Sequence, residues 1–220
     1  MDDDGVFIIE APYLVDFLQK RYFDLVYHEH LSYWSVASLI LLFKRFSMEV
    51  LNVEKVAVHG GSIRVFVKKK NGIHKRKNRI DEFLRLEKKQ RLKDIRTYLK
   101  FQKEVENNRL KLLDLLTRLK AKNKKIAGYG APAKGNTLLN YFGIGTEFLD
   151  YIVDDSPWKQ GLYSPGKRIP VVPSKTLYEE KPDYLLILAW NFADSIINIH
   201  RKFKELGGKF IIPVPTPKII

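Results

Sequence analysis

The first third of the chain alternates apolar and polar stretches in patterns typical of short strands and helices. Residues 5–10 form a nearly continuous apolar run, as in a strand that is buried on both faces. Residues 13–19 and 36–46 place apolar side chains at helical spacing, and Ser35 is suited to cap the second of these helices. We therefore expect a central strand followed by two helices.

A glycine pair then separates two β-rich runs. Residues 56–59 and 62–67 are rich in β-branched and aromatic side chains, and Gly60 and Gly61 lie between them. This arrangement predicts a β-hairpin with a tight turn. His59 precedes the glycines directly, so we expect it to serve the turn rather than catalysis.

The middle of the chain has a helical pattern. Residues 79–123 contain neither proline nor glycine, and their apolar side chains recur about every 3.6 positions, opposite Lys and Arg. Because this stretch exceeds the length of a usual globular helix, we expect two helices or one bent helix.

Strand and helix patterns alternate from residue 124 to the end. Such alternation predicts a parallel sheet wound in right-handed βαβ units. The predicted fold class is therefore α/β, with a Rossmann-like parallel-sheet domain at 124–220 and a helical connector at 79–123 that follows a smaller unit at 1–78. The apolar runs expected to form strands of the C-terminal domain are 126–127, 148–153, 171–172, 184–190 and 209–214, with a helix at 192–206.

The first strand of this domain leads into a glycine turn. Gly128, Gly130 and Ala133 match the G-x-G-x-x-G/A pattern, in which backbone N–H groups and a helix N-terminus face a phosphate. Glycines that only allow close packing of helix on strand would give the same pattern, so the motif leaves both interpretations open.

Polar and aromatic residues follow the carboxyl ends of the predicted strands, where ligands bind in sheets of this kind. Lys134 would add positive charge beside a phosphate, and Asp154, in the pair 154–155, is placed to take ribose hydroxyls. Trp190 could stack on a ring. Together with Asn136 and Asn191, and with the residues of the glycine turn, these side chains form the predicted substrate-binding set.

The densest group of titratable side chains is Tyr27-His28-Glu29-His30. Histidine titrates near neutrality, and a tyrosine or carboxylate neighbour can orient its ring for acid–base chemistry. Two histidines at i and i+2 would lie on one side of an extended segment, which makes a metal pair conceivable. With no cysteine and no evident third ligand, we expect no metal. Histidines that only satisfy a core would give the same spacing.

Composition and charge narrow the class of protein. The 220 residues suffice for two domains, no apolar run could span a bilayer, and the acidic N-terminus is unlike a secretory signal, so we expect a cytoplasmic protein. Residues 68–125 carry 22 basic and 7 acidic side chains, a net charge of +15 within a total of +14. Such a segment can bind nucleic acid. A solvated helix face has the same composition and is the favoured interpretation.

Several separated motifs, in the same order, resemble the C-terminal part of the SAM-dependent sugar C-methyltransferases. The similarity extends over essentially all 220 residues, which makes it more specific than the glycine pattern alone. The motifs are YHEHLSYWS (27–35), VHGGSIRVFV (58–67), GYGAPAKGNTLLNYFGIG (128–145), DDSPWKQGLYSPGKRIPV (154–171) and LAWNFADSI (188–196).

The resemblance implies a reaction and roles for particular residues. These enzymes methylate a carbon next to the keto group of a nucleotide-linked deoxysugar. His30 matches the base that removes the proton from that carbon, and Tyr27 and Glu29 match neighbours that position the sugar. The resulting enolate carbon would attack the methyl group of SAM.

The resemblance also implies a division of the chain and a missing part. Residues 1–78 match the C-terminal fragment of a methyltransferase domain of the Rossmann type, 79–123 the basic helical connector, and 124–220 a substrate- and nucleotide-binding domain. The family's zinc-site cysteines and SAM loop would precede residue 1. The glycine turn at Gly128 is therefore expected to serve the substrate and not SAM.

Three functions follow from this interpretation. The first is the C-terminal portion of a sugar C-methyltransferase, inactive alone, which either complements a separate N-terminal SAM-binding polypeptide or is a remnant or shortened form of such an enzyme. Its unpaired sheet edge also predicts self-association or a partner. The second is a non-catalytic module that binds a nucleotide or nucleotide sugar. The third is nucleic-acid binding through the basic connector.

Overall fold

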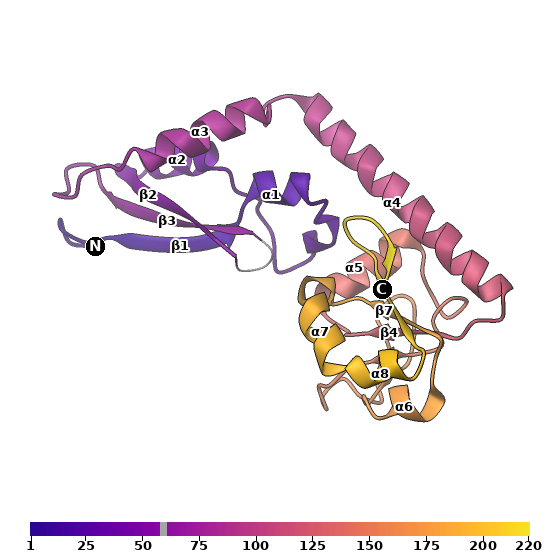
Figure 1. Ribbon diagram of the computed structural model, residues 1–220. Coiled ribbons are helices and arrows are strands. Elements are labelled where there is room, and N and C mark those ends of the chain that lie inside the picture. Colours follow the sequence, from indigo (N-terminus) through magenta and orange to yellow (C-terminus); the bar gives the residue numbers. More distant parts are fainter. Residues whose placement is uncertain (58–60) are drawn as a thin grey trace. The chain divides into compact units, whose positions relative to one another are not determined.

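A computed structural model describes residues 1–57 and 61–220, and its fold is mixed α/β. The chain forms two compact units (Figure 1). Met1–Arg21 and Leu31–Lys103 make the first unit, and Tyr22–His30 and Glu104–Ile220 make the second. A short N-terminal segment thus belongs to the C-terminal unit. No helix in the described part of the chain is long and apolar enough to cross a membrane.

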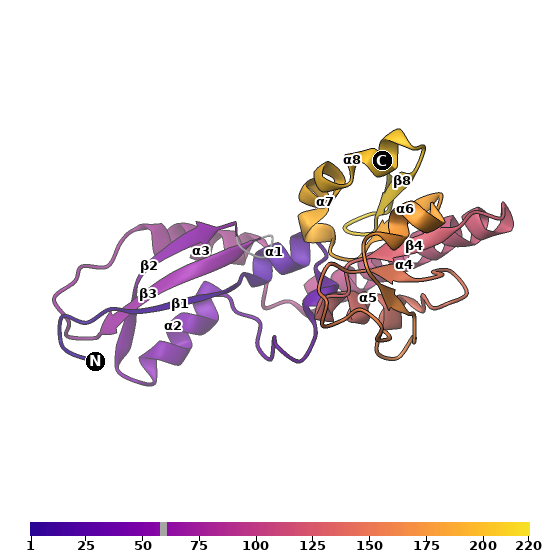
Figure 2. The same cartoon turned by 90° about the horizontal axis from the view of Figure 1, so that it is seen from below.

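The first unit is built on a three-stranded antiparallel sheet. The strands lie in the order β1-β3-β2, and Figure 2 shows them side by side. The pairing of β2 with β3, from Met48 opposite Lys69 to Val56 opposite Ser62, confirms the predicted hairpin. The predicted tight turn is wrong, because a two-residue turn at Gly60 and Gly61 would place residue 59, and not Val56, opposite Ser62. The predicted turn residues His59 and Gly60 lie outside the described residues. The strands are β1 (Phe7–Pro12), β2 (Met48–Val56) and β3 (Ser62–Lys69), and the helices are α1 (Leu14–Gln19), α2 (Val36–Lys44) and α3 (Arg79–Lys89).

Strand β1 corrects one prediction. Residues 5–10 were expected to form a strand buried on both faces, but β1 pairs with β3 alone among the described residues. Its residues Phe7 and Ile8 are 46% and 52% exposed. An apolar run in the sequence shows which side chains the strand has, but it does not show which other elements of the fold cover them. The strand therefore forms where predicted, at the edge of its sheet.

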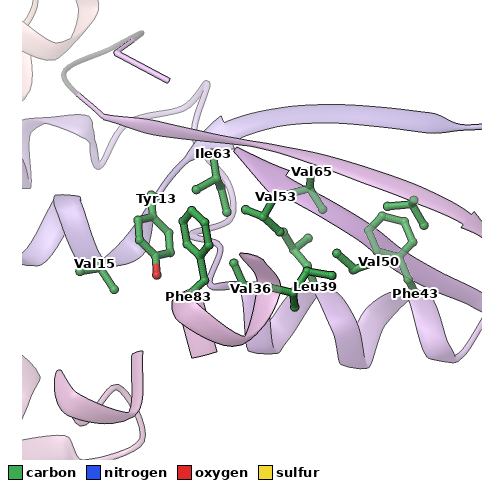
Figure 3. Close-up of a cluster of buried hydrophobic side chains, with 12 residues drawn as sticks. Tyr13, Val15, Val36, Leu39, Phe43, Val50, Val53, Ile63, Val65 and Phe83 are labelled. Carbon is green, nitrogen blue, oxygen red and sulfur yellow. The ribbon is translucent and has the colours of Figure 1, made fainter. Parts of the chain in front are cut away.

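Helices α2 and α3 enclose the core of the first unit. Figure 3 shows Val53, Ile63 and Val65 of the sheet lying against Val36 and Leu39 of α2. These five side chains are fully excluded from solvent. Burial of apolar surface of this kind is the main contribution to the folding free energy of such a unit.

The N-terminus of α2 is held twice. Ser35 caps the helix as predicted, in a capping box with Ser38. The buried carboxylate of Glu87, on α3, accepts the backbone N–H groups of Val36 at 2.6 Å and Ala37 at 3.0 Å. The Tyr13 hydroxyl donates to the same carboxylate at 3.1 Å. This second cap joins three elements that are distant in sequence.

The helical stretch after residue 78 contains two helices. α3 ends at Lys89, Arg91 adopts a left-handed φ of 52°, and α4 (Ile95–Ala121) follows. This confirms the expected interruption. Helix α3 buries Ile80 and Phe83 in the first core, while α4 contributes residues up to Lys103 to the first unit and the rest to the second.

The second unit is built on a six-stranded sheet in the order β6-β5-β4-β7-β8-β9. The first five strands run parallel, which confirms the predicted parallel sheet, and β9 runs antiparallel to β8. The chain leaves β4 toward β5 and returns to its other side at β7, so β4 lies at the switch point. The elements are β4 (Ile126–Tyr129), α5 (Ala133–Phe142), β5 (Ile152–Val153), β6 (Val171–Val172), α6 (Thr176–Glu180), β7 (Tyr184–Ile187), α7 (Ala193–Ile199), α8 (Arg201–Glu205), β8 (Lys209–Ile212) and β9 (Lys218–Ile219).

The helix predicted at 192–206 is divided into α7 and α8. The division falls at His200, whose backbone has φ −100° and ψ 31°. Its ring is buried and bonded through both nitrogens to tyrosine hydroxyls. Tertiary hydrogen bonds thus accompany a break in a stretch whose sequence pattern is continuous.

Candidate functional site

The segment from residue 22 to residue 30 packs on the second unit. It contains the 3-10 helix η1 (Phe23–Leu25). The Phe23 ring stacks on Phe142 of α5 with centroids 4.7 Å apart, and the Tyr22 ring lies 4.8 Å from Trp190. These contacts place the predicted base and the glycine turn in the same compact unit.

The structure brings Tyr27, Glu29 and His30 together on the loop after η1. The Tyr27 hydroxyl donates to Glu29 Oε2 at 3.0 Å, and the backbone N–H of His30 donates to the Tyr27 carbonyl at 3.0 Å. The Tyr27 and His30 rings meet edge to face with centroids 5.0 Å apart. Glu29 is exposed and His30 is half-buried. The arrangement can orient a tyrosine hydroxyl beside an imidazole, while their catalytic roles stay predictions.

The glycine turn has a packing explanation. Gly130 adopts a left-handed φ of +83°, and a Cβ there would lie 2.9 Å from the Ala189 side chain. A Cβ on Gly128 would lie 3.0 Å from Ile152 on the neighbouring strand. Helix α5 then begins at Ala133 without a side-chain cap. Backbone conformation and packing account for Gly130, and close packing favours Gly128. Phosphate binding at the turn stays a prediction.

Asp154 and Asp155 follow β5 but have different partners. Asp154 is buried, and its carboxylate accepts the N–H groups of Ala131 at 2.7 Å and Ser156 at 2.9 Å. Lys159 approaches it at 3.3 Å. Asp154 thereby ties the loop after β5 to the glycine turn. Its predicted contact with ribose hydroxyls stays a prediction.

Asp155 ends a chain of hydrogen bonds that the sequence did not indicate. Its carboxylate can only accept, so the Tyr129 hydroxyl donates to it at 2.6 Å. The Tyr129 oxygen then accepts from His200 Nε2 at 2.9 Å, and the neutral ring accepts from the Tyr178 hydroxyl at Nδ1, at 3.0 Å. Hydrogen bonds from Ser174 and Tyr129 lower the pKa of Asp155, while burial lowers the pKa of His200. Local sequence contains no signal for a network whose members lie tens of residues apart.

Lys134, Trp190 and Asn191, three residues of the predicted substrate-binding set, lie together. The Lys134 ammonium lies 4.2 Å from the centroid of the Trp190 ring and donates to the Asn191 side-chain oxygen. Trp190 is only 8% exposed, and its indole N–H donates to Asp24 Oδ2 at 2.5 Å. The sequence did not single out Asp24. Asn136 lies in the first turn of α5, where its backbone N–H donates to the Pro132 carbonyl at 3.4 Å.

Two charged groups in this cluster have displaced pKa values. Burial raises the pKa of Asp24 to about 6, against the opposing effects of Lys134 and of the Trp190 hydrogen bond. Burial lowers the pKa of Lys134 to about 8, against the attraction of Asp24. The two groups therefore titrate closer to neutrality than exposed side chains of their kinds.

The described residues offer no evident metal site. Within residues 1–57 and 61–220, no three His, Cys, Asp or Glu side chains are grouped so that they could hold a metal ion. His28 and His30 on the loop after η1 thus have no third ligand among these residues.

Comparison with known proteins defines the family. The family described as "C-methyltransferase C-terminal domain" matches residues 57–215. The match covers well over half of the chain, and the protein belongs to this family. The chain is also similar to the C-methyltransferase NovU of Streptomyces niveus, with 40% identity over 217 residues. The similarity covers 99% of this chain and 52% of NovU, so the chain spans about half the length of this curated relative.

Proposed function

We propose that residues 1–220 form the C-terminal portion of a SAM-dependent sugar C-methyltransferase. In this proposal His30 is the base that acts on a nucleotide-linked keto-deoxysugar, and the second unit carries the nucleotide-sugar side of the site. Membership of the C-methyltransferase C-terminal domain family is the observation on which the proposal rests. It is supported by the presence of Tyr27–His30 and the glycine turn in one compact unit.

The proposed step is removal of a proton from the carbon next to a keto group. A neutral imidazole of His30 takes the proton, and the electron pair of the C–H bond moves toward the keto oxygen to form an enolate. Tyr27, whose hydroxyl is held by Glu29, would orient the sugar beside the base. SAM, the methyl donor that the family implies, supplies the methyl group that the enolate carbon receives.

The second unit is proposed to bind the nucleotide portion as a Rossmann-like domain. Its strand order, with β4 at the switch point, supports this, because ligands bind beyond the carboxyl ends of strands at such a point. The residues proposed for this side are Gly128, Gly130, Ala133, Lys134, Asn136, Asp154, Trp190 and Asn191.

The SAM site is proposed to lie outside residues 1–220. The relative NovU is about twice as long as the matched region, which leaves room for such a site. The donor site would be supplied by a further segment of the same protein or by a separate polypeptide. The glycine turn at Gly128 is assigned in this proposal to the nucleotide sugar and not to SAM.

Methyl transfer from labelled SAM to a 4-keto-deoxysugar nucleotide tests the proposal. Residues 1–220 alone should show no turnover, and addition of a polypeptide carrying the N-terminal half of a full-length relative should restore it. His30→Ala should then abolish turnover, whereas His28→Ala on the same loop should reduce it far less. Turnover by residues 1–220 alone, or full activity of His30→Ala, would contradict the proposal.

Calorimetry separates this function from that of a non-catalytic module. Both functions predict binding of thymidine or uridine diphosphate to residues 1–220. Only the methyltransferase predicts turnover after complementation. Binding without turnover in any combination of polypeptides would favour the module.

A further inference from the structure

Asp24 is a fully buried carboxylate that the proposed chemistry does not use. Its Oδ2 accepts the Trp190 indole N–H at 2.5 Å. Its Oδ1 is buried and has no hydrogen-bond partner among the described residues. A neutral amide could accept the same indole hydrogen without the desolvation cost of a charge. The carboxylate, however, makes a charge-assisted bond, which is roughly twice as strong as a neutral one.

Two aromatic contacts adjoin the hydrogen bond. Tyr22 and Phe23 directly precede Asp24 in the sequence; Tyr22 packs on Trp190, and Phe23 stacks on Phe142 at an interplanar angle of 14°. Three consecutive residues are therefore attached to two elements of the second unit, the region after β7 and helix α5. Tyr27–His30 begins three residues after Asp24. The loop that carries the proposed base therefore continues directly from an attached segment.

Lys134 completes the cluster electrostatically. Its ammonium lies over the ring of Trp190, whose N–H bonds Asp24, and the attraction of Asp24 favours the charged form of the lysine. Lys134 is also the residue expected to face a phosphate. One buried carboxylate thus acts both on the loop that carries the proposed base and on the cation of the proposed substrate site.

We propose that Asp24 is a positioning residue, which fixes the Tyr27–His30 loop on the second unit through its hydrogen bond to Trp190. The consequence for catalysis rests on the proposed function of His30, whereas the attachment of the loop does not. In the intact site, Asp24 would hold the base at a constant place relative to the substrate bound by the same unit.

Hydrogen–deuterium exchange and kinetics test the two parts separately. In Trp190→Phe and in Asp24→Leu, amides in peptides covering residues 25–32 should exchange about tenfold faster or more, because the loop opens locally. The double variant should be no worse than either single variant, since both remove the same bond. In the complemented assay, kcat should fall about tenfold or more in both variants.

Two control variants distinguish positioning from general damage. Tyr129→Phe removes two other hydrogen bonds in the same unit, to Asp155 and His200, and should leave exchange at 25–32 unchanged. Asp24→Asn keeps the shape and an acceptor oxygen for the indole, so it should retain most of the protection. If Asp24→Leu does not fold, the positioning role is still tested by comparing amide exchange at 25–32 in Trp190→Phe with that in Asp24→Asn.

The outcomes are distinct from those of the proposed function. Wild-type exchange at 25–32 in Trp190→Phe, or equal loss in Tyr129→Phe, would overturn the positioning role. Wild-type kcat in Trp190→Phe despite faster exchange would overturn its catalytic consequence. If exchange is faster in Trp190→Phe but no complemented chain ever shows turnover, the attachment of the loop would be supported and the proposed function would be wrong.

Discussion

At the scale of single residues, the second unit buries ionisable groups beside one another. Asp24, Lys134, Tyr129 and His200 each have a pKa displaced mainly by burial, and each has a partner that limits the displacement or fixes its proton. Groups of this kind make folding depend on pH when the folded and unfolded pKa values differ. Asp24 gives the clearest case.

The pKa of Asp24 predicts a loss of stability as pH rises. Its pKa is raised from 3.8 to about 6 in the folded protein, so the folded state holds the proton more tightly than the unfolded state. The stabilisation is fully present below the unfolded pKa and is lost between about pH 4 and pH 6, with a total of about 3 kcal/mol. Asp24→Asn does not titrate. Its free energy of unfolding should therefore rise relative to wild type by about 2–3 kcal/mol between pH 4 and pH 7.

Urea unfolding at a series of pH values measures this difference. Asp150→Asn is the control, because Asp150 is exposed and paired with Lys120 at the surface. Its difference from wild type should stay within about 0.5 kcal/mol across the same range. Parallel curves for wild type and Asp24→Asn would show that the carboxylate is not destabilised by burial.

At the scale of elements, Glu87 joins α3 to the start of α2. Two backbone N–H groups of α2 and the Tyr13 hydroxyl all donate to its buried carboxylate. Glu87→Ala leaves these donors without their acceptor and should lower the free energy of unfolding by about 2–4 kcal/mol. Glu87→Gln keeps one acceptor oxygen and should have a smaller effect.

Chemical denaturation, with exchange at the amides of Val36 and Ala37, checks this prediction. Glu82→Gln is a matched control, since Glu82 is an exposed glutamate on the same helix. It should change stability by no more than about 0.5 kcal/mol. Equal effects of Glu82→Gln and Glu87→Ala would indicate that the loss comes from helix charge and not from the cap.

The secondary-structure elements also show which features of the fold could be predicted from the sequence. The cap at Ser35 and the pairing of the hairpin strands depend on signals close together in sequence, and the parallel sheet depends on the alternation of strand and helix patterns along 124–220. These three are confirmed, whereas the tight turn of the hairpin is not. The Glu87 cap joins residues 51 positions apart, and the Asp24–Trp190 bond joins residues 166 apart. No local pattern encodes such pairs. The prediction that β1 is buried on both faces was wrong for the same reason. Burial depends on neighbouring elements, and the apolar sequence of residues 5–10 does not specify them.

The candidate site follows the same rule. Tyr27, Glu29 and His30 are adjacent in sequence, and their mutual contacts could be expected from a tight loop. Their attachment to the unit that contains Gly128 could not, since residues 22–30 and 104–220 are separated by most of the first unit. The grouping of Lys134 with Asn191 was predictable only through the rule that strand ends meet at one edge of a parallel sheet.

At the scale of the whole molecule, the outer edge of β1 predicts association. Among the described residues β1 pairs with β3 alone, and Phe7 and Ile8 are about half exposed. Unpaired backbone groups and apolar side chains on an edge strand favour pairing with another chain. Residues 1–220 should therefore show a mass above 25.7 kDa in light scattering, increasing with concentration.

Substitution on β1 tests whether this edge is responsible. Ile8→Lys places a charge on the strand and should shift the chain toward the monomer. Leu41→Lys on α2 is the matched control, because Leu41 is 64% exposed but lies outside the sheet. If the edge is instead covered by the polypeptide that carries the SAM site, addition of that polypeptide should suppress self-association of the wild type, and Ile8→Lys should weaken the complex. Two results together would mean that β1 has no partner. The wild-type chain would remain monomeric, and it would bind the complementing polypeptide no more tightly than Ile8→Lys does.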